Sequence, residues 1–557
     1  MQWSVINAAL PANDVRQAWT GVSGDGHSVV WKGLGVGPVT LSESERTEIC
    51  CKLLGAEPKA LKTLADQSFR VVSGEYERSV ILHSTTPGAG AFEGDLARLR
   101  DGHKPKNYAG YVETRAVYLG QAGDLAIGRM ESWKTAATLA GLKTVEVPGA
   151  EYYHLIDALL TQAEAHLESP SACILQLAGY LQTYPEAVIR LYGLNNAMQT
   201  FLIWLKQTAG LDRIFIDANS RDLANALNSK NILYPAVDAA RQMDIPDTAP
   251  PFAILEQEQK QAPLYQKLGL EWSGLPGYTI RRRDVSLADF TRQILLAAEL
   301  LRLRYGLEQG CLKSAGAGDG ANITPGIDLK DKYGLRSLAE KAYPNRDDYV
   351  LESQFYYATA TIGDQEIKLA PSAHIRASML APGITLQFTE GTSWAGNIFI
   401  DEPLAQTTGI SAEQYRYIRQ MMSAFLEACR REYGGLAIAG IDFAIGKVEG
   451  KFGDDLLLGI QDPNISFNGA EFLRTFMTRA GREKNRESSG LHAATRVFIP
   501  AEDCTHASLS EHLSSVAGED VYTEIIAIVP GYWGMIGVAA PEFRLLIQHL
   551  DRLKKVL

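Results

Sequence analysis

Two stretches in the C-terminal half, "AGIDFAIG" at 439–446 and "GIQDPNISFNG" at 459–469, each combine an apolar run with acidic or amide side chains. Asp442 lies inside the first run, where a bare buried carboxylate is costly unless a cation compensates it. Asp462 and Asn464 are two positions apart at the end of a predicted strand, so their side chains project to one side. An edge strand or an Asp-Pro-Asn turn would explain each stretch alone. Together, two carboxylates and an amide oxygen are hard ligands suited to Mg²⁺.

A glycine-rich segment, "CLKSAGAGDGANI" at 311–323, precedes these stretches by more than a hundred residues. Lys313 ends a predicted strand, and glycines follow at alternate positions, which leaves backbone N–H groups open to a phosphate. The spacing is not the G-x-G-x-x-G of a dinucleotide fold, and the Lys-Ser pair precedes the glycines instead of following them as in a P-loop. By itself the segment is either a structural hairpin or a lid over a phosphate.

The region from about 250 to 480 resembles the ATP-grasp superfamily, whose members are mostly ATP-dependent carboxylate–amine ligases. The resemblance rests on the order lysine, glycine loop, strand aspartate and Asp-x-Asn. It also rests on "EQKQAPLYQKLGLEWSGLPGYTI" at 258–280, which is similar to the entry segment of that superfamily, and on the hinge-like strand "YVLESQF" at 349–355. The C-terminal "GYWGMIGVAA" is similar to the pheganomycin-type peptide ligases of natural-product biosynthesis.

The resemblance implies ATP and Mg²⁺ as cofactors, and a small-molecule carboxylate and an amine as substrates. It implies nucleotide contacts from Lys260 (with Lys267 as the alternative), Lys313, Ser314, Gly316, Gly318, Gly320 and Glu352. It implies metal contacts from Asp442, Asp462 and Asn464. A nucleotide-binding regulator and a phosphotransferase on the same fold are the alternative functions.

The chain departs from the superfamily pattern at the arginines that often flank the metal ligands. Gly440 stands two residues before Asp442, and "ISF" follows Asn464. We therefore predict that the acyl phosphate is stabilised by Arg376, with His374 on the same strand face as a second catalytic candidate. The competing candidates are Arg474 and Arg479.

The pattern of elements predicts a mixed α/β (α+β) protein, with two ATP-grasp lobes after an N-terminal α/β region. Helices are expected at 42–55, 256–268, 286–306 and 411–434, and strands at 28–37, 78–84 and 212–217. The apolar stretch 525–540 reads as two buried strands around a turn. The predicted domains are 1–148, 149–250, 251–348, 349–483 and 484–557.

Composition restricts the partners and the compartment. The net charge of −11 argues against a basic nucleic-acid-binding surface. Six sparse cysteines without a C-x-x-C pair indicate neither a disulfide framework nor a zinc site, as expected for a reducing cytoplasm. The N-terminus lacks the pattern of a signal peptide, and no apolar run is long enough to span a membrane. A homodimer is a further expectation.

Overall fold

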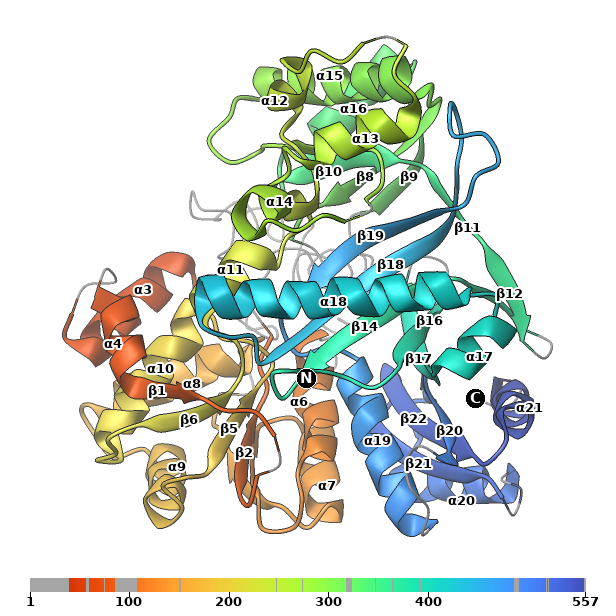
Figure 1. The fold of residues 1–557 in the computed structure, drawn as a ribbon. Coiled ribbons are helices and arrows are strands. Elements are labelled where there is room, and N and C mark those ends of the chain that lie inside the picture. Colours follow the sequence, from red (N-terminus) through yellow and green to blue (C-terminus); the bar gives the residue numbers. More distant parts are fainter. Residues whose placement is uncertain are drawn as a thin grey trace, which may run out of the picture.

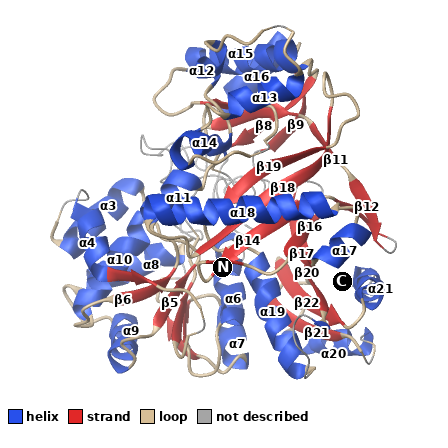
Figure 2. Cartoon of the chain, viewed as in Figure 1, coloured by secondary structure: helices blue, strands red, loops and turns tan. Residues whose placement is uncertain are grey.

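The computed structural model describes residues 40–56, 60–74, 76–85, 108–149, 152–246, 248–272, 274–316, 323–345, 347–362, 365–390, 393–484, 490–516, 518 and 520–554. The strand predicted at 28–37, Gly318 and Gly320 lie outside these residues. Parallel and antiparallel sheets are both present and helices pack on them (Figures 1 and 2), so the predicted mixed α/β class is confirmed.

The N-terminal unit is a six-stranded parallel sheet with the strand order β1-β6-β5-β2-β3-β4. Its strands are β1 (Phe69–Val71), β2 (Ser79–Leu82), β3 (Leu125–Gly128), β4 (Lys143–Glu146), β5 (Val188–Leu191) and β6 (Ile214–Asp217). Its helices are α3 (Glu43–Leu54), α4 (Leu61–Ser68), α6 (Tyr108–Ala116), α7 (Glu131–Leu139), α8 (Leu155–His166), α9 (Ala172–Thr183) and α10 (Asn196–Thr208), with the short helix η3 (Val117–Leu119). The predicted boundary at 148/149 falls between β4 and β5, so it does not separate two domains. Parallel strands need long crossovers, and these spread one sheet over both segments.

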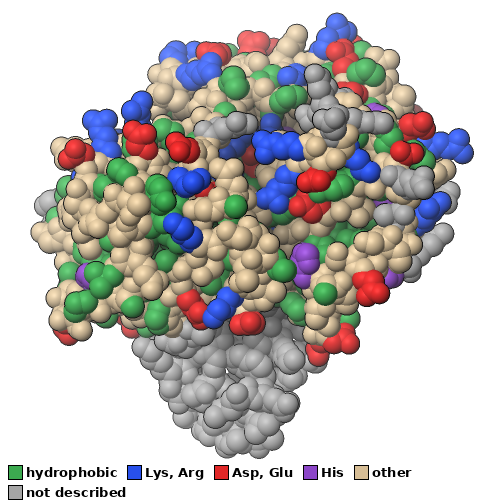
Figure 3. All heavy atoms as spheres, turned by 90° about the horizontal axis from the view of Figure 1, so that it is seen from below, with side chains coloured by type: hydrophobic (Ala, Val, Ile, Leu, Met, Phe, Trp, Pro, Cys, Tyr) green, Lys and Arg blue, Asp and Glu red, His purple; other side chains and the backbone are tan. Residues whose placement is uncertain are grey.

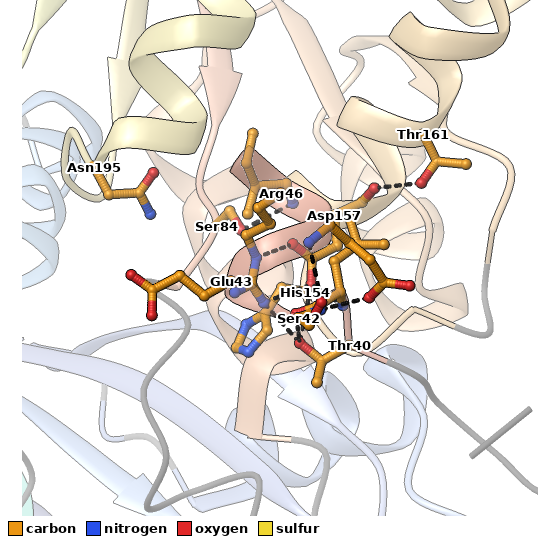
Figure 4. Close-up of polar contacts among 12 residues, drawn as sticks. Thr40, Ser42, Glu43, Arg46, Ser84, His154, Asp157, Thr161 and Asn195 are labelled. Atoms are coloured by element: carbon orange, nitrogen blue, oxygen red, sulfur yellow. Dashed lines mark hydrogen bonds and ion pairs between the residues drawn. The ribbon is translucent and has the colours of Figure 1, made fainter. Parts of the chain in front are cut away.

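A buried carboxylate holds the beginning of the described chain against helix α8 (Figure 4). Asp157, with no exposed surface, accepts hydrogen bonds from Thr40 Oγ1 at 3.0 Å and from the Leu41 N–H at 3.1 Å. Arg46 contacts both carboxylate oxygens, through Nε at 2.8 Å and Nη2 at 3.1 Å. Ser42 caps helix α3 with a complete capping box, which explains why this helix begins where the sequence predicts. Because every polar atom of Asp157 has a partner, we read this cluster as structural.

His154, the residue that precedes helix α8, makes the stability of this unit depend on pH. The ring is 4% exposed, and its Nδ1 lies 2.9 Å from Thr85 Oγ1. Burial lowers the pKa of His154 to about 4. The unfolded chain therefore binds a proton at a higher pH than the folded chain. Above pH 6.5 the ring is neutral in both states and does not oppose folding. As the pH falls from 6.5 toward 4, the unfolded chain gains the proton first, so the free energy of unfolding decreases by about 3 kcal/mol in total.

We expect the difference in unfolding free energy between the wild type and His154→Gln to shrink by that amount between pH 7 and pH 4. Urea unfolding across this pH range measures the difference. His166→Gln removes an imidazole from the last residue of helix α8 and is the control for losing a ring at another position. A difference that stays constant with pH for His154→Gln would contradict the assignment.

The second unit is the upper lobe in Figure 1, a four-stranded antiparallel sheet in the order β7-β10-β8-β9 with helices on one side. Its strands are β7 (Gly277–Ile280), β8 (Gln309–Ser314), β9 (Ile323–Asp328) and β10 (Tyr349–Ser353). Its helices are α12 (Val237–Arg241), α13 (Pro251–Gln259), α14 (Pro263–Leu268), α15 (Leu287–Tyr305) and α16 (Lys332–Ala342). The single helix predicted at 256–268 is two helices, since Pro263 begins α14 and cannot continue α13. Strand β10, expected in the following domain, belongs to this lobe.

The third unit is a ten-stranded sheet in the order β11-β18-β14-β16-β17-β20-β22-β21, with β15 on β14 and β19 on β18. Its strands are β11 (Phe355–Tyr357), β14 (Pro371–Arg376), β15 (Met379–Leu380), β16 (Ile384–Glu390), β17 (Ser393–Ile400), β18 (Ile438–Val448), β19 (Leu457–Asn464), β20 (His492–Phe498), β21 (Tyr522–Val529) and β22 (Trp533–Ala540). A separate hairpin pairs β12 (Thr359–Ile362) with β13 (Gln365–Lys368). Its helices are α17 (Glu402–Thr407), α18 (Ala412–Tyr433), α19 (Ala470–Glu483), α20 (His506–Val516) and α21 (Phe543–Lys554).

The predicted C-terminal subdomain, 484–557, contributes β20 to β22 to this same sheet, and β20 pairs with β17. The two strands predicted at 525–540 are confirmed as β21 and β22. An apolar cluster that includes Trp133, Phe472 and Met535 joins these strands and helix α19 to the N-terminal unit. Helix α11 (Arg221–Leu227) and the short helix η4 (Lys230–Leu233) connect the N-terminal unit to the upper lobe. Within the described ranges, no helix has the length and apolar character needed to cross a membrane.

Candidate active site

Strands β18 and β19 bring the two predicted acidic metal ligands face to face. Asp442 lies directly opposite Asp462, and the ladder shifts register immediately after Asp442. Asn464 Nδ2 donates to Asp442 Oδ2 at 3.0 Å, and Ser372 Oγ on β14 donates to the other oxygen. Behind this contact, Gln387 Nε2 donates to Ser372 Oγ at 2.8 Å. The pairing of two strands close together in the sequence therefore gathers Asp442, Asp462 and Asn464, as predicted.

Two opposed carboxylates repel each other, and the structure shows both the repulsion and its compensation. Burial, followed by the charge of Asp462, raises the pKa of Asp442 to about 6. Lys230 Nζ lies 3.1 Å from Asp462 Oδ2 and supplies positive charge to the pair. No group of three or more His, Cys, Asp or Glu side chains in the described part of the chain could hold a metal ion. Two carboxylates and an amide oxygen fit Mg²⁺ held jointly with substrate phosphates, because that ion keeps few protein ligands.

The upper lobe holds a lysine on strand β8 whose side chain is only 12% exposed. Lys313 pairs with Glu352 on β10, and Tyr234 O–H donates to Glu352 Oε2 at 2.5 Å. Burial is the largest influence and disfavours the charged lysine, but Glu352 together with Tyr357 and Cys311 outweighs burial and raises the pKa of Lys313 above its usual range. Lys313 therefore carries a fixed positive charge at the strand end where the glycine segment begins, as a phosphate contact requires.

Lys230 is the residue of this site that the sequence analysis missed. It lies in η4, is 7% exposed, and its backbone N–H donates to the Ala315 carbonyl at 3.0 Å. One residue thus contacts both the start of the glycine segment and the Asp442–Asp462 pair. The only sequence signal was a lysine after the Ser220-capped helix α11, in a segment assigned to another domain. The chain after Asn464 is also held from this side, because Asn228 Oδ1 accepts from the Ile465 N–H at 2.8 Å.

The other predicted nucleotide contacts, Lys260, Ser314 and Gly316, differ in exposure and in their partners. Lys260 follows helix α13, is about half exposed, and its Nζ lies 3.5 Å from Glu256. Among the described residues, Lys260 forms no hydrogen bond or ion pair with Lys313 or Glu352, so Lys230 takes its place in our proposal. Ser314 is buried, and its Oγ donates to Asp347 Oδ2 at 3.0 Å. Gly316 lies at the end of the described segment, beside the same aspartate.

Arg376, predicted to stabilise an acyl phosphate, is occupied by structural ion pairs. Its guanidinium binds both oxygens of Asp217 at the end of β6, and its Nε lies 3.1 Å from Glu471 on α19. It therefore ties the N-terminal sheet to the large sheet. His374 is 6% exposed, its Nε2 lies 3.0 Å from Thr385 Oγ1, and burial lowers its pKa to about 3. A histidine with that pKa is neutral and only weakly basic near pH 7, so the geometry gives neither residue its predicted catalytic role.

The structure also explains Gly440, where many members of the superfamily have arginine. A Cβ atom at Gly440 would lie 3.0 Å from His374 Nδ1 and 3.1 Å from Asn468 Nδ2, so these side chains fill the space. Among the rival arginines, Arg479 is held by Glu524 at 3.2 Å and by two backbone carbonyls. Arg474 Nε lies 3.7 Å from Glu471 Oε1, and the charge of Arg474 contributes, after burial, to the lowered pKa of His374. Its Nε has no hydrogen-bond partner among the described residues.

Basic side chains gather near the middle of the face drawn in Figure 3, around a hollow, although the chain as a whole has a net charge of −11. A mixed α/β fold with two largely buried lysines and a pair of opposed carboxylates defines a candidate phosphate- and metal-binding protein. No protein-family profile and no curated protein sequence matches the chain.

Among solved structures, N5-carboxyaminoimidazole ribonucleotide synthetase from Thermus thermophilus is similar, with 12% identity and a TM-score of 0.44 over 80% of this chain and 96% of that chain. The biotin carboxylase domain of the Hydrogenobacter thermophilus 2-oxoglutarate carboxylase, solved with MgADP, ADP and bicarbonate, has 12% identity and a TM-score of 0.43 over 83% and 85%. D-alanyl-alanine synthetase A from Vibrio cholerae has 12% identity and a TM-score of 0.29 over 54% and 73%. Because these sequence identities and TM-scores are low, the function that we propose rests on the residues of this chain.

Proposed function

We propose that the chain is an ATP-dependent ligase of the ATP-grasp type that joins a carboxylate to an amine. The observation that supports this most is the opposed Asp442–Asp462 pair with Lys230 beside it. Lys230 also contacts the start of the glycine segment, so the same residue links the metal-type carboxylates to the phosphate-type loop. A merely structural hairpin has no need of a half-buried pair of like charges at this position.

In the proposed reaction, a substrate carboxylate oxygen attacks the γ-phosphorus of ATP and the bond to ADP breaks, which gives an acyl phosphate. The amine nitrogen then attacks the acyl carbon, the bond to phosphate breaks, and the amine loses its proton to the solvent. Asp442, Asp462 and Asn464 would hold Mg²⁺, which neutralises phosphate charge when bound. The chain's own contribution is mostly positioning and fixed charge.

Three groups of this chain would supply the positive charge and keep water away from the acyl phosphate. Lys313 and Lys230 hold buried positive charge on two sides of the phosphate path, where low polarity strengthens their interaction. The segment from Ser314 to Gly320 would donate backbone N–H groups and exclude water from the acyl phosphate. Arg474, whose Nε has no hydrogen-bond partner among the described residues, replaces Arg376 as the group that we assign to the acyl phosphate. We assign no proton transfer to His374.

The test is ADP release by the purified protein with Mg²⁺ATP and pools of carboxylates, amino acids and dipeptides. We expect release only when a carboxylate and an amine are present together, with one phosphate formed for each ADP. Release without phosphate formation, with a phosphorylated product, would establish a phosphotransferase instead. Binding of MgADP with no release in any pool would overturn the ligase proposal and favour a nucleotide-binding regulator.

The narrower expectations of a pheganomycin-type peptide ligase, a homodimer and a cytoplasmic location stay predictions.

A further inference from the structure

We propose that the substrate carries a second anionic group, a carboxylate or a phosphate, and that Arg115 and His83 bind this group. The site lies where the N-terminal parallel sheet meets the loop between β19 and α19. This inference rests on the proposed function and narrows its substrate class to acids with a further anionic group away from the reacting carboxylate.

Arg115 on helix α6 is a buried cation with an incomplete set of partners. The residue is 4% exposed, and its Nε has no hydrogen-bond partner among the described residues. Four aromatic rings surround the guanidinium, with centroids 4.7 to 5.9 Å away: Tyr111, Phe472, Tyr192 and Trp533. Cation–π contacts recover part of the cost of burial, but they do not replace a counter-charge. Within the described ranges, no carboxylate forms an ion pair with Arg115.

Arg129 is the matched comparison in the same unit. It is 8% exposed, and its Nε lies 3.3 Å from Glu113 Oε1. Its Nη2 also donates to the Tyr153 carbonyl at 2.7 Å. This chain therefore provides a carboxylate where a buried arginine is purely structural. Arg115 has no such carboxylate among the described residues, and we infer that a bound anion takes its place.

His83 offers a second pair of unused polar atoms beside Arg115. It follows strand β2, is 1% exposed, and neither ring nitrogen has a hydrogen-bond partner in the described structure. The Tyr192 ring lies 6.1 Å from the His83 ring, centroid to centroid, and 5.8 Å from the Arg115 guanidinium, so both side chains adjoin the same ring. Burial, followed by the charge of Arg115, lowers the pKa of His83 well below its usual range. A neutral imidazole can donate one hydrogen bond to an anion. Buried polar atoms without partners are rare enough to need an explanation, and a bound group provides one.

The position of the two residues in the fold supports a ligand site. In the strand order β1-β6-β5-β2-β3-β4, the chain runs to one side of β2 through β3 and β4, and to the other side through β5 and β6. Ligands of open parallel sheets bind at such a switch, at the carboxyl ends of the strands. His83 follows β2 and Tyr192 follows β5, so they flank the switch.

The same place is connected to the candidate metal ligands. The Phe467 N–H donates to the Tyr192 carbonyl at 3.0 Å, and the Phe467 ring packs edge-on against His83 with centroids 4.7 Å apart. Phe467 stands in the short loop that follows Asn464. A small substrate could therefore place one anionic group at Arg115 while its reacting carboxylate lies near the Asp442–Asp462 pair.

The experiment measures anion binding to the full chain by calorimetry and by thermal unfolding, with inorganic phosphate and succinate as probes at constant ionic strength. We expect at least one probe to bind the wild type, and Arg115→Met to weaken it roughly 10- to 100-fold, the effect of losing a charged hydrogen bond. Arg115→Met should also raise the unfolding temperature without a probe, since it removes a buried charge that no described carboxylate compensates. Arg129→Met should lower that temperature, because it strands Glu113. His83→Phe should weaken binding of the probe, while the new ring keeps the packing against Phe467.

MgADP binding is measured on the same samples. If MgADP binds but neither probe distinguishes the wild type from Arg115→Met, the anion site is overturned while the proposed function stands. If MgADP does not bind at all, the proposed function fails separately. A decrease in the unfolding temperature of Arg115→Met comparable to that of Arg129→Met would show that Arg115 is structural and would also overturn the proposal. The probe that binds with the higher affinity identifies the anionic group as a phosphate or a carboxylate.

Discussion

Asp442→Asn is expected to lower ATP turnover by at least about a thousandfold, which corresponds to losing about 4 kcal/mol of metal-dependent stabilisation. The substitution keeps the shape of the side chain and an oxygen that can accept from Ser372, so the β18–β19 pairing should survive. It removes one of the two negative charges that face each other across the strands. We therefore expect MgADP to stabilise the variant against heat no more than ADP does without Mg²⁺, whereas the wild type should show a clear difference.

Asp454→Asn is the matched control for this experiment. Asp454 lies in the turn that joins the same two strands, its side chain is 98% exposed, and it pairs with Lys447 at 2.8 Å. Its replacement removes the same charge from the same hairpin and should leave turnover within about twofold, as for an exposed ion pair. Turnover by Asp442→Asn that stays within tenfold of the wild type would show that Asp442 is not a metal ligand.

Lys313→Met should destabilise the protein by about 3–5 kcal/mol and abolish nucleotide binding. The loss of stability follows from Glu352, which is 2% exposed and would keep a buried charge with no cation beside it. The double variant Lys313→Met/Glu352→Gln removes both charges, and Tyr234 can still donate to the amide oxygen. We expect it to recover most of the stability and none of the affinity for ADP. Urea unfolding and calorimetric titration with MgADP separate the two effects.

Lys330→Met provides the comparison for an exposed pair in the same lobe. Lys330 pairs with Glu308, and both side chains are more than half exposed. Its loss should change stability by less than about 1 kcal/mol. Recovery of ADP affinity by the double variant would contradict a phosphate-binding role for Lys313, because a structural ion pair alone would then account for both charges.

Local patterns in the sequence were enough to predict several long elements. The helices expected at 42–55, 286–306 and 411–434 are present, because Ser42, Ser286 and Ser411 cap them and glycine ends each one. The carboxylate pair was also predictable, since β18 and β19 follow each other directly along the chain. Such features depend on residues near one another in sequence, where hydrogen bonding and side-chain periodicity act without the rest of the fold.

Sheet membership and the partners of buried charges were not predictable in this way. The boundaries at 148/149 and 483/484 fall inside single sheets, because strand pairing joins segments that are distant in sequence. Arg376 looked available for catalysis until the fold placed Asp217 and Glu471 beside it.

The sequence by itself determined the element types, the lysine–glycine segment and the order of the acidic and amide residues. Only the tertiary structure decided that Lys230 lies beside the candidate metal ligands and that Arg376 is a structural tie. It also decided that Arg115 is buried with no carboxylate beside it among the described residues. The physical reason is that a charge interacts through space with every group around it. The cost or benefit of burying it is therefore set by long-range packing, which no local pattern records.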